Sequence, residues 1–386
     1  MGAGVSCGSM VTGGAGVTRG RRIVGGPGEH AAMRPVLKAG LRAVWRDRDT
    51  LQIGVDPRRA VALSGMSDAA RVISLLDGSR DWESVMAAAR DAGISVKTAQ
   101  RVLGLLAAAG ALSDLPLATL NALEPAARGR IGTELAAAAL THDHCDGGGR
   151  TLARRRLAFV RVHGGGRIGA AVAGLLAAAG VGQVVGRDGG LARPEDLSPA
   201  GLGLADLDLP RADGMARLIG RIAPDVQTAD QGERPDLAVL TGPGHWDAAA
   251  ELSRARIPHL AVAGAEGVAV VGPLVRPGRS ACLRCRELAR SERDPSWPLI
   301  LAQLASAGDG ACDTVLAATV AAQAAVQVLT FLDTGRPGTA VSDGALELAV
   351  PDWQWRRRSW PPHPRCPCRA ASSGTRPPGR PHDHHR

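Results

Sequence analysis

The fold is decided by residues 157 to 169, which read Leu-Ala-Phe-Val-Arg-Val-His-Gly-Gly-Gly-Arg-Ile-Gly. The first part is a short run of β-forming side chains, and the last six residues have the spacing G-x-G-x-x-G. An alanine- and leucine-rich segment follows at 170 to 179, and a second β-rich run lies at 182 to 186. A strand, a glycine turn, a helix and a second strand in this order predict a Rossmann-like nucleotide-binding unit.

Each glycine of the turn has a predicted role. Gly164 permits the tight turn, Gly166 lets the backbone approach a phosphate, and Gly169 allows the helix to pack closely. The helix N-terminus adds backbone N–H groups and a positive dipole. Asp188 follows the second strand, where a carboxylate can accept a hydrogen bond from a ribose hydroxyl. These four residues are the predicted nucleotide site. The alternative is an α/β fold whose glycine turn no longer binds a nucleotide.

Further strand and helix segments extend this unit toward the C-terminus. Runs rich in β-forming residues at 236 to 240 and 258 to 263 flank a helix at 246 to 256. A run at 267 to 273 is expected to be another strand, which leads out of the sheet. Alternating strands and helices predict the α/β class with a doubly wound sheet, in which ligands bind at the carboxyl ends of the strands.

Four of the seven cysteines form two tight pairs. Two residues separate Cys282 from Cys285, one separates Cys366 from Cys368, and 80 residues lie between the pairs. Four thiolates can close a tetrahedral structural zinc site, so these cysteines are predicted to bind zinc if the fold brings them together. The alternative for Cys282 and Cys285 is a redox role. It is disfavoured because their surroundings predict a loop after a strand rather than the start of a helix.

The remaining cysteines and histidines carry a weaker signal. Cys7, Cys145 and Cys312 have no partner at ligand spacing and are expected to be incidental. The stretches at 142 to 145 and 382 to 385 are rich in histidine, but we expect both to be solvated rather than metal-binding. The predicted metal centre therefore rests on the two cysteine pairs.

The segment from 33 to 115 has a different pattern. Alternating runs at 36 to 41 and 51 to 55 predict a hairpin, and three short amphipathic helices with a returning strand at 111 to 112 are expected to follow. The expected helix caps are Ser67 or Asp68, then Asp81 or Ser84, then Ser95. Three short helices flanked by strands are typical of a winged helix-turn-helix. Such a domain binds DNA, clamps an extended leader peptide against a sheet edge, or serves only as a docking domain. The segment alone leaves these alternatives open.

Composition narrows the classes of function. The chain has 386 residues and a formal net charge of +9, and its 46 basic residues include only two lysines, Lys38 and Lys97. The arginines are scattered, and the densest run, at 356 to 358, is short, so nucleic acid is not expected to be the main partner. No uninterrupted apolar stretch predicts a membrane span; the segment from 316 to 332 is expected to be a buried helix. Cysteine usage fits a reducing cytoplasm.

Shifts in composition divide the chain into six expected segments. They are a disordered extension at 1 to 32, a winged-helix-like domain at 33 to 115, which the resemblance given next implies to be a leader-recognition domain, a linker with a helix at 116 to 156, a Rossmann domain at 157 to 350, a zinc-binding segment at 351 to 370 and a disordered tail at 371 to 386.

The order of these features resembles the ThiF-type, ubiquitin-activating-enzyme-like adenylyltransferases. The resemblance rests on the glycine turn, on Asp188, and on two cysteine motifs, Cys282-Leu283-Arg284-Cys285 and His363-Pro364-Arg365-Cys366-Pro367-Cys368. With the winged-helix-like segment in front, the chain looks like the leader-binding ThiF-like proteins that work beside YcaO cyclodehydratases in the biosynthesis of thiazole/oxazole-modified peptides. The resemblance implies ATP and magnesium at the glycine turn, structural zinc, a precursor leader peptide as ligand, and a homodimer.

Departures from the family pattern bear on activity. Arg167 and Ile168 stand where the family motif G-x-G-G-L-G has its last Gly-Leu, and 186 to 188 retains only the second acid of D-x-D. No lysine follows Lys97 and no acid ends the strand at 236 to 240, so the family's lysine and metal-binding aspartate lack counterparts. We therefore expect a protein that binds a leader peptide, presents the peptide to a YcaO-type partner and has lost adenylation. An active ATP-dependent adenylyltransferase acting on a C-terminal carboxylate is the first alternative, ahead of a nicotinamide oxidoreductase and a DNA-binding regulator.

Overall fold

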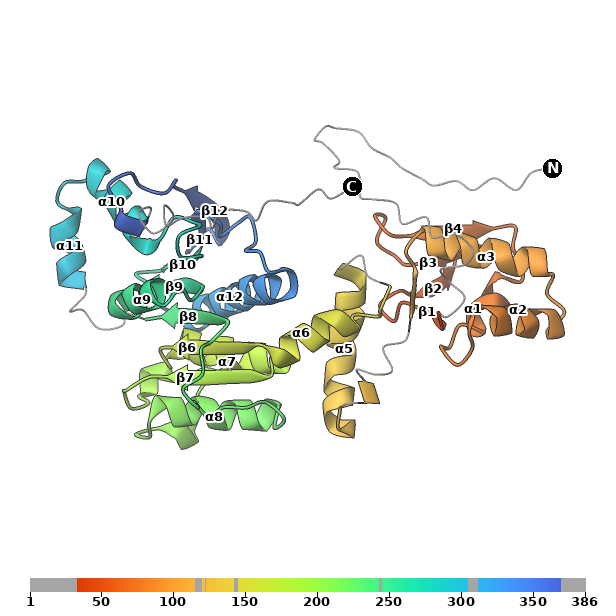
Figure 1. Ribbon diagram of the computed structural model, residues 1–386, viewed down its shortest axis with the longest axis horizontal. Helices are drawn as coiled ribbons and strands as arrows, with labels where there is room; N and C mark the ends of the chain where they lie inside the picture. Colours follow the sequence, from red (N-terminus) through yellow and green to blue (C-terminus); the bar gives the residue numbers. More distant parts are fainter. Residues whose placement is uncertain are drawn as a thin grey trace, which may run out of the picture. The chain divides into compact units, whose positions relative to one another are not determined.

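The computed structural model describes the chain in two compact units, Met1–Ala153 and Arg154–Arg386, here called unit 1 and unit 2 (Figure 1). The described residues are 33 to 114, 120 to 121, 123 to 141, 145 to 242, 245 to 304 and 312 to 368. The predictions of disorder at 1 to 32 and 371 to 386, and those for Cys7, 142 to 144 and 382 to 385, lie outside these residues.

Unit 1 contains two small antiparallel sheets. Its strands are β1 (Pro35–Leu37), β2 (Ala43–Trp45), β3 (Thr50–Ile53), β4 (Val61–Ser64) and β5 (Leu112–Asp114). The order β2-β3-β4 forms one sheet, and β1 pairs with β5 in the other. The predicted hairpin of 36 to 41 with 51 to 55 is therefore wrong, because each run pairs with a different strand. The long-range pairing of β1 with β5 joins residues nearly 80 positions apart, which no local pattern indicates.

The helices of unit 1 match the predicted amphipathic segments. The three matching helices are α1 (Ala69–Ser74), α2 (Trp82–Asp91) and α3 (Val96–Ala108). They are followed by α5 (Pro125–Thr141) and by α6 (Gly149–Leu157), which crosses the boundary between the units. Asp81 caps α2 by accepting from the Ser84 N–H at 2.8 Å, and Ser95 caps α3 through the Thr98 N–H at 3.1 Å. Asp68 precedes α1 but its side chain makes no capping bond. Apolar faces of the first three helices and of β3 and β4 form a single buried cluster.

Unit 2 is built on a seven-stranded mixed sheet with the order β12-β11-β10-β9-β8-β6-β7. The strands are β6 (Phe159–His163), β7 (Gln183–Arg187), β8 (Leu237–Thr241), β9 (His259–Ala265), β10 (Val268–Val275), β11 (Gly344–Ala349) and β12 (Gln354–Ser359). The first four are parallel, and the other three continue the sheet in antiparallel fashion. The α/β class is confirmed. The strand expected at 267 to 273 is present as β10, but it does not lead out of the sheet, because it pairs with both β9 and β11.

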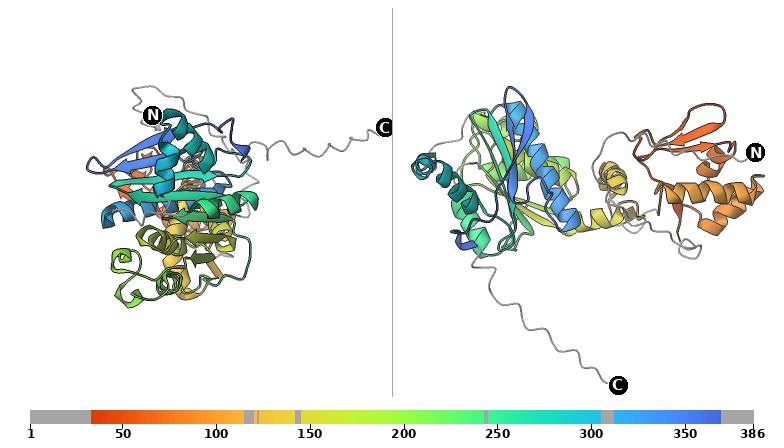
Figure 2. Two further views of the ribbon diagram at one scale, coloured as in Figure 1. Left: turned by 90° about the vertical axis from the view of Figure 1, so that its left-hand side faces the viewer. Right: turned by 90° about the horizontal axis from the view of Figure 1, so that it is seen from above.

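Helices cover both faces of this sheet (Figure 2). They are α7 (Arg167–Ala178), α8 (Arg211–Ile222), α9 (His245–Arg254), α10 (Leu283–Arg293), α11 (Trp297–Leu304) and α12 (Thr314–Thr334), with short 3-10 turns at Pro194–Asp196 and Leu204–Asp206. The main core of the unit joins one face of the sheet to α7, α8 and α12. A smaller apolar cluster packs α9 and the start of α10 on the opposite face.

The long helix α12 is the one described helix with the length and apolar composition to cross a membrane. Its residues Leu316, Val320 and Val328 are fully buried against the sheet and α7. At its C-terminal end, Asp333 forms a buried ion pair with Arg155 at 2.7 Å, which ties the last turn of α6 to α12. The helix is therefore a core element of unit 2, as predicted for 316 to 332.

Candidate functional site

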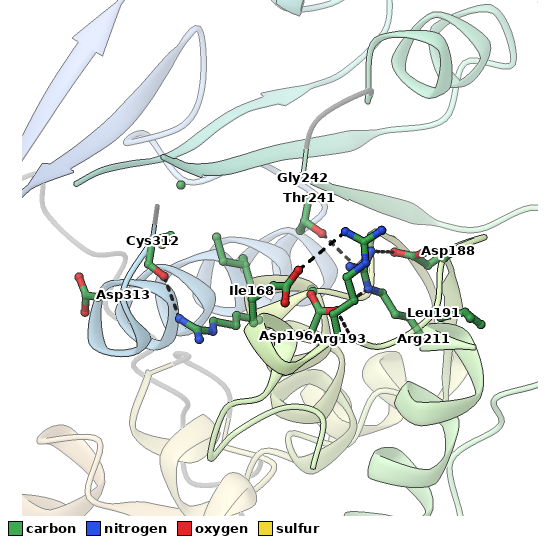
Figure 3. Close-up of a pocket in the computed structure, with 17 residues that line it drawn as sticks. Ile168, Asp188, Leu191, Arg193, Asp196, Arg211, Thr241, Gly242, Cys312 and Asp313 are labelled. Carbon is green, nitrogen blue, oxygen red and sulfur yellow. Dashed lines mark hydrogen bonds and ion pairs between the residues drawn. The ribbon is translucent and has the colours of Figure 1, made fainter. Parts of the chain in front are cut away.

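A pocket of about 800 Å³ lies at the carboxyl ends of β6, β7 and β8 (Figure 3). The chain passes from β6 to β7 on one side and later returns to β8 on the other side of β6. This change of direction is the point at which doubly wound sheets bind ligands. The four residues of the predicted nucleotide site, Gly164, Gly166, Gly169 and Asp188, all line this pocket. What the pocket binds remains a prediction.

The glycine turn is held against the end of β8. Gly164 has φ of +93°, a conformation that side chains disfavour, and a Cβ there would collide with the carbonyl oxygen of Thr241. A Cβ on Gly169 would overlap the Gly164 oxygen and lie 2.7 Å from Thr241 Oγ1. That hydroxyl donates to the carbonyl of His163 at 2.8 Å. Gly166 is the N-cap of α7 and has an ordinary negative φ. The turn therefore needs glycine at two positions for reasons of packing alone.

Asp188 braces two loops of the pocket. One carboxylate oxygen accepts from the Gly165 N–H at 2.6 Å, and the other accepts from the Gly190 N–H at 2.7 Å. Each oxygen keeps a further acceptor position, because a carboxylate offers about four lone-pair sites. The predicted bond to a ribose hydroxyl is thus compatible with the geometry, although the side chain already has a structural role.

Arg211 and Asp196 are pocket residues that the sequence did not reveal. Arg211 Nε donates to Asp196 Oδ2 at 2.8 Å, and another guanidinium nitrogen lies 3.7 Å from Asp188. Asp196 also accepts from the Arg193 N–H at 2.9 Å. Arg211 opens α8 and Asp196 ends a short 3-10 turn, so neither belongs to the glycine motif. Neither residue carries a local sequence signal, because arginine is abundant throughout this chain.

The opposite end of the pocket is formed by the start of α12. Arg167 donates to the carbonyl of Cys312 at 3.1 Å, and Asp313 caps α12 by accepting from the Val315 N–H at 2.9 Å. Burial, together with the nearby Asp313 carboxylate, raises the pKa of the Cys312 thiol. Cys312 was expected to be incidental. It lines the pocket, but its raised pKa does not favour a nucleophilic thiolate.

The second candidate site is the cysteine quartet, Cys282, Cys285, Cys366 and Cys368. Its four sulfur atoms all lie within 4.8 Å of one another. Cys282 Sγ lies 3.7 Å from Cys285 Sγ and 3.6 Å from Cys366 Sγ, and Cys285 Sγ lies 3.4 Å from Cys368 Sγ. Thiolates around a tetrahedral zinc ion, with Zn–S of about 2.3 Å, would be roughly 3.8 Å apart. The quartet therefore could hold a metal ion with little adjustment.

Hydrogen bonds next to the quartet join the segment of the first cysteine pair to the segment of the second pair. The His363 N–H donates to Cys285 Sγ at 3.3 Å, and the His363 ring contacts Glu292 at 3.0 Å. Arg365 N–H donates to Nδ1 of that ring, which leaves Nε2 as the donor to Glu292. Burial raises the pKa of the Cys282 thiol to about 12 in the absence of a cation. A divalent cation would offset that burial cost by stabilising thiolates.

One prediction about Cys282 and Cys285 is wrong. They were expected to lie in a loop, but Cys282 is the N-cap of α10 and Cys285 lies in its first turn. A helix start was the argument for a redox pair, since it lowers thiol pKa values. In this structure, however, both thiols face the second cysteine pair. The proximity of all four sulfurs, rather than the local backbone, favours metal binding.

Comparisons with known proteins identify the fold. No model of a known protein family matches the chain, and no curated protein matches its sequence. In structure, the chain has the ThiF-type fold. It superposes on E. coli MccB solved with ATP with a TM-score of 0.62 and 14% identity, over 86% of this chain and 98% of that one.

Two further structures show the same fold. "The structure of Microcin C7 biosynthetic enzyme MccB in complex with N-formylated MccA" gives a TM-score of 0.63 and 15% identity, over 87% of this chain and 99% of that chain. PaaA gives 0.59 and 16% identity, over 83% and 98%. The matched 87% of this chain is longer than unit 2 alone, so the structural similarity includes part of unit 1.

Proposed function

We propose that this chain is a peptide-binding, non-adenylating ThiF-like protein of peptide modification. Unit 1 binds a precursor leader peptide, and the protein presents that peptide to a YcaO-type cyclodehydratase in the cytoplasm. Unit 2 is stapled by zinc at the cysteine quartet and, as the resemblance to ThiF-type proteins implies, forms a homodimer. The MccB structure with N-formylated MccA supports a ligand role of this kind, because the two proteins share one fold over most of this chain.

We infer the loss of adenylation from the ion pairs of a pocket arginine and from the residues at the end of β8. Adenylation needs cations free to stabilise charge on the reacting phosphates and carboxylates free to hold magnesium. Here Arg211 is clamped by Asp196 and Asp188. The described end of β8 offers Thr241 and Gly242 and no acid. The arginine beside Asp188 is therefore engaged with carboxylates, and the described end of β8 supplies no carboxylate ligand for magnesium.

An active adenylyltransferase is the second candidate. The shared fold with MccB, which is called a biosynthetic enzyme and was solved with ATP, favours it. The test is pyrophosphate release from ATP in the presence of a synthetic peptide that ends in glycine with a free C-terminal carboxylate. We expect no release above the protein-free rate. Release that depends on the peptide would overturn the non-adenylating proposal in favour of this second candidate.

The β2-β3-β4 sheet of unit 1 has two edge strands beside which the leader peptide can add a strand. In the β2-β3-β4 sheet, β3 is central, and its partners are therefore the edges. The Arg46 N–H donates to the Thr50 oxygen at 2.9 Å and the Gly54 N–H to the Arg42 oxygen at 2.7 Å. Because hydrogen-bonded pairs alternate along an antiparallel ladder, the intervening N–H of Ala43 points away from β3.

The same argument applies to the other edge. The Gly65 N–H donates to the Asp49 oxygen at 3.0 Å, so Ser64 and Ala62 occupy the alternate pairs with β3. The N–H of Ala62 therefore points outward, like that of Ala43 on β2. A peptide that adds a strand would accept from one of these two donors.

The two donors give a matched pair of variants. Ala43→Pro and Ala62→Pro each remove one outward N–H, and neither N–H bonds to β3. Binding of the labelled precursor peptide is measured by fluorescence anisotropy, with thermal unfolding to verify folding. We expect one variant to weaken binding about tenfold and the other to bind normally, which identifies the edge. Normal binding by both folded variants would contradict strand addition on this sheet.

A further inference from the structure

We propose that the pocket of unit 2 binds a nucleoside monophosphate without magnesium. The inference rests on the proposed non-adenylating function and deepens it by naming the ligand class of the retained pocket. The resemblance implies magnesium at the site of a nucleoside triphosphate, so the first question is whether the pocket offers a place for that ion. Magnesium requires oxygen ligands in a near-octahedral arrangement, with one or two carboxylates supplied by the protein.

The two carboxylates beside the glycine turn do not fit this requirement. Asp188 uses both oxygens to accept from backbone N–H groups and lies near Arg211. Asp196 is 3% exposed and accepts from Arg211 and from the Arg193 N–H. A magnesium ion at either carboxylate would lie close to the Arg211 guanidinium, which repels it.

The other two acids of the pocket lie at its rim. The side chain of Glu195 is 60% exposed and lies 3.7 Å from an Arg193 nitrogen. Asp313 is exposed, belongs to the start of α12, and caps that helix. Neither belongs to the strand end where the resemblance implies the metal-binding aspartate. The described residues thus do not form the carboxylate set that a magnesium–triphosphate complex needs.

The charge of the lining favours a ligand with a single phosphate. Three arginines and four carboxylates line the pocket, and one of those arginines is already neutralised by two of the carboxylates. Without magnesium, each added phosphate increases repulsion from the acids. A monophosphate carries about two negative charges near neutral pH, fewer than a diphosphate or triphosphate, so it meets the least repulsion from the four carboxylates of the lining.

The N-terminus of α7 and Arg167 supply contacts for the phosphate. The first backbone N–H groups after Gly166 have no partner within the helix itself, and the helix dipole is positive there. Arg167 lines the pocket beside them, and its Nε is buried with no hydrogen-bond partner among the described residues. A phosphate oxygen at the helix start would satisfy that donor. Arg193 faces the pocket from the other side (Figure 3).

The nucleoside follows from the other groups of the lining. Asp188 has acceptor positions left for a sugar hydroxyl at the end of β7. Ile168 and Leu191 add apolar surface, and Leu191 is 53% exposed in the structure. Covering that side chain with a planar base would remove apolar area from water. The volume of about 800 Å³ is within the range of small-ligand pockets.

The test is isothermal titration of the full-length protein with AMP, ADP and ATP, each with MgCl₂ and with EDTA. We expect AMP to bind most tightly, with less than a twofold change between MgCl₂ and EDTA. We also expect ATP to bind at least tenfold more weakly than AMP. Tighter binding of ATP that requires magnesium, or no binding of AMP at all, would overturn the inference.

A pair of arginine variants and a sugar analogue locate the site. Arg167→Gln is expected to weaken AMP binding about tenfold, whereas Arg254→Gln, on the exposed end of α9, is expected to leave it unchanged. Deoxy-AMP lacking one ribose hydroxyl should lose a similar factor if Asp188 binds the sugar. Equal affinities of both variants would place AMP outside this pocket and so contradict the inference.

AMP titration and the pyrophosphate assay together show whether nucleotide binding or the proposed function is at fault. If AMP does not bind but the precursor peptide does, without pyrophosphate release, only the inference fails. If peptide-dependent pyrophosphate release is observed with magnesium and ATP, the non-adenylating proposal fails as well.

Discussion

The cysteine quartet and the glycine-turn pocket place their functional groups in opposite ways. Four sulfurs from two distant segments converge so that every pair lies within 4.8 Å. In the pocket, by contrast, Arg211 bonds to another lining residue, Asp196, at 2.8 Å and lies near Asp188. Groups that converge on one point predict a ligand there, because their burial is otherwise costly. Groups that satisfy one another are stable without one.

The difference teaches how a site can keep its shape and change its chemistry. The backbone of the glycine turn is constrained by packing of Gly164 and Gly169 against Thr241, whatever the pocket binds. The cysteines pack only in a small buried cluster with Ala281, Leu288 and Trp360. We therefore expect the structure around the quartet to depend on a bound metal ion, and the structure of the glycine turn to depend on the residues packed against it. Each substitution below tests one of these two expectations.

The largest expected effect is loss of the metal. Cys282→Ser should reduce bound zinc from about one per chain to none, and lower the stability of unit 2 by several kcal/mol, or about 10 °C in Tm. Metal analysis of the purified protein and thermal unfolding measure both. Cys145→Ser is the matched control, since Cys145 is exposed and outside the quartet, and should change neither. A wild-type protein without metal would contradict the zinc prediction.

The second prediction tests whether the turn depends on packing. Gly169→Ala places a Cβ against the Gly164 oxygen, so the chain must shift at a point where backbone lies on both sides. We expect a loss of about 3 kcal/mol in the free energy of unfolding. Denaturant titration measures it.

Gly220→Ala is the control for that variant. Gly220 lies inside α8 and has nothing within 4 Å of the position that a Cβ would take. Alanine there should stabilise the protein by about 0.5 to 1 kcal/mol, because it lowers the entropy of the unfolded chain. Equal effects of the two substitutions would show that the glycine turn is not packed as described.

The sequence predicted the parallel half of unit 2 better than the rest of the fold. Strand β6, helix α7 and strand β7 follow one another within about 30 residues, so local patterns suffice. The antiparallel half was not anticipated, because β11 and β12 lie some 70 residues after β10 and carry no local sign of their partner. The same reason explains the wrong hairpin in unit 1, where β1 pairs with β5 across three helices.

The candidate site residues also differ in whether a local sequence pattern reveals them. The cysteine quartet could be predicted because cysteine is rare and its spacing is informative. Asp188 followed from its position after a strand. Arg211 and Asp196 could not be predicted, because arginine and aspartate are common in this chain and their pairing depends on how a loop folds back toward α8.

The smallest expected effect concerns pH at the strand that precedes the turn. Burial, with Arg187 and Arg161 nearby, lowers the pKa of His163 to about 4. In the unfolded chain the imidazole titrates near its ordinary value of about 6.5, so between the two values the unfolded state binds more protons. Stability therefore rises with pH through that window and falls as pH drops. From pH 7.5 to 5 the expected loss is about 2 kcal/mol.

Zinc release at low pH acts in the same direction, because thiolates take up protons as they lose the metal. Comparing wild type with His163→Phe by denaturant titration at both pH values separates the two contributions. The variant should lose less stability than wild type over this range, by about the histidine contribution, while metal analysis at pH 5 reports the state of the quartet. If the variant keeps the full pH dependence, the quartet rather than the strand before the turn is the acid-sensitive part of unit 2, which would reverse the contrast between a ligand-dependent and a packing-dependent site.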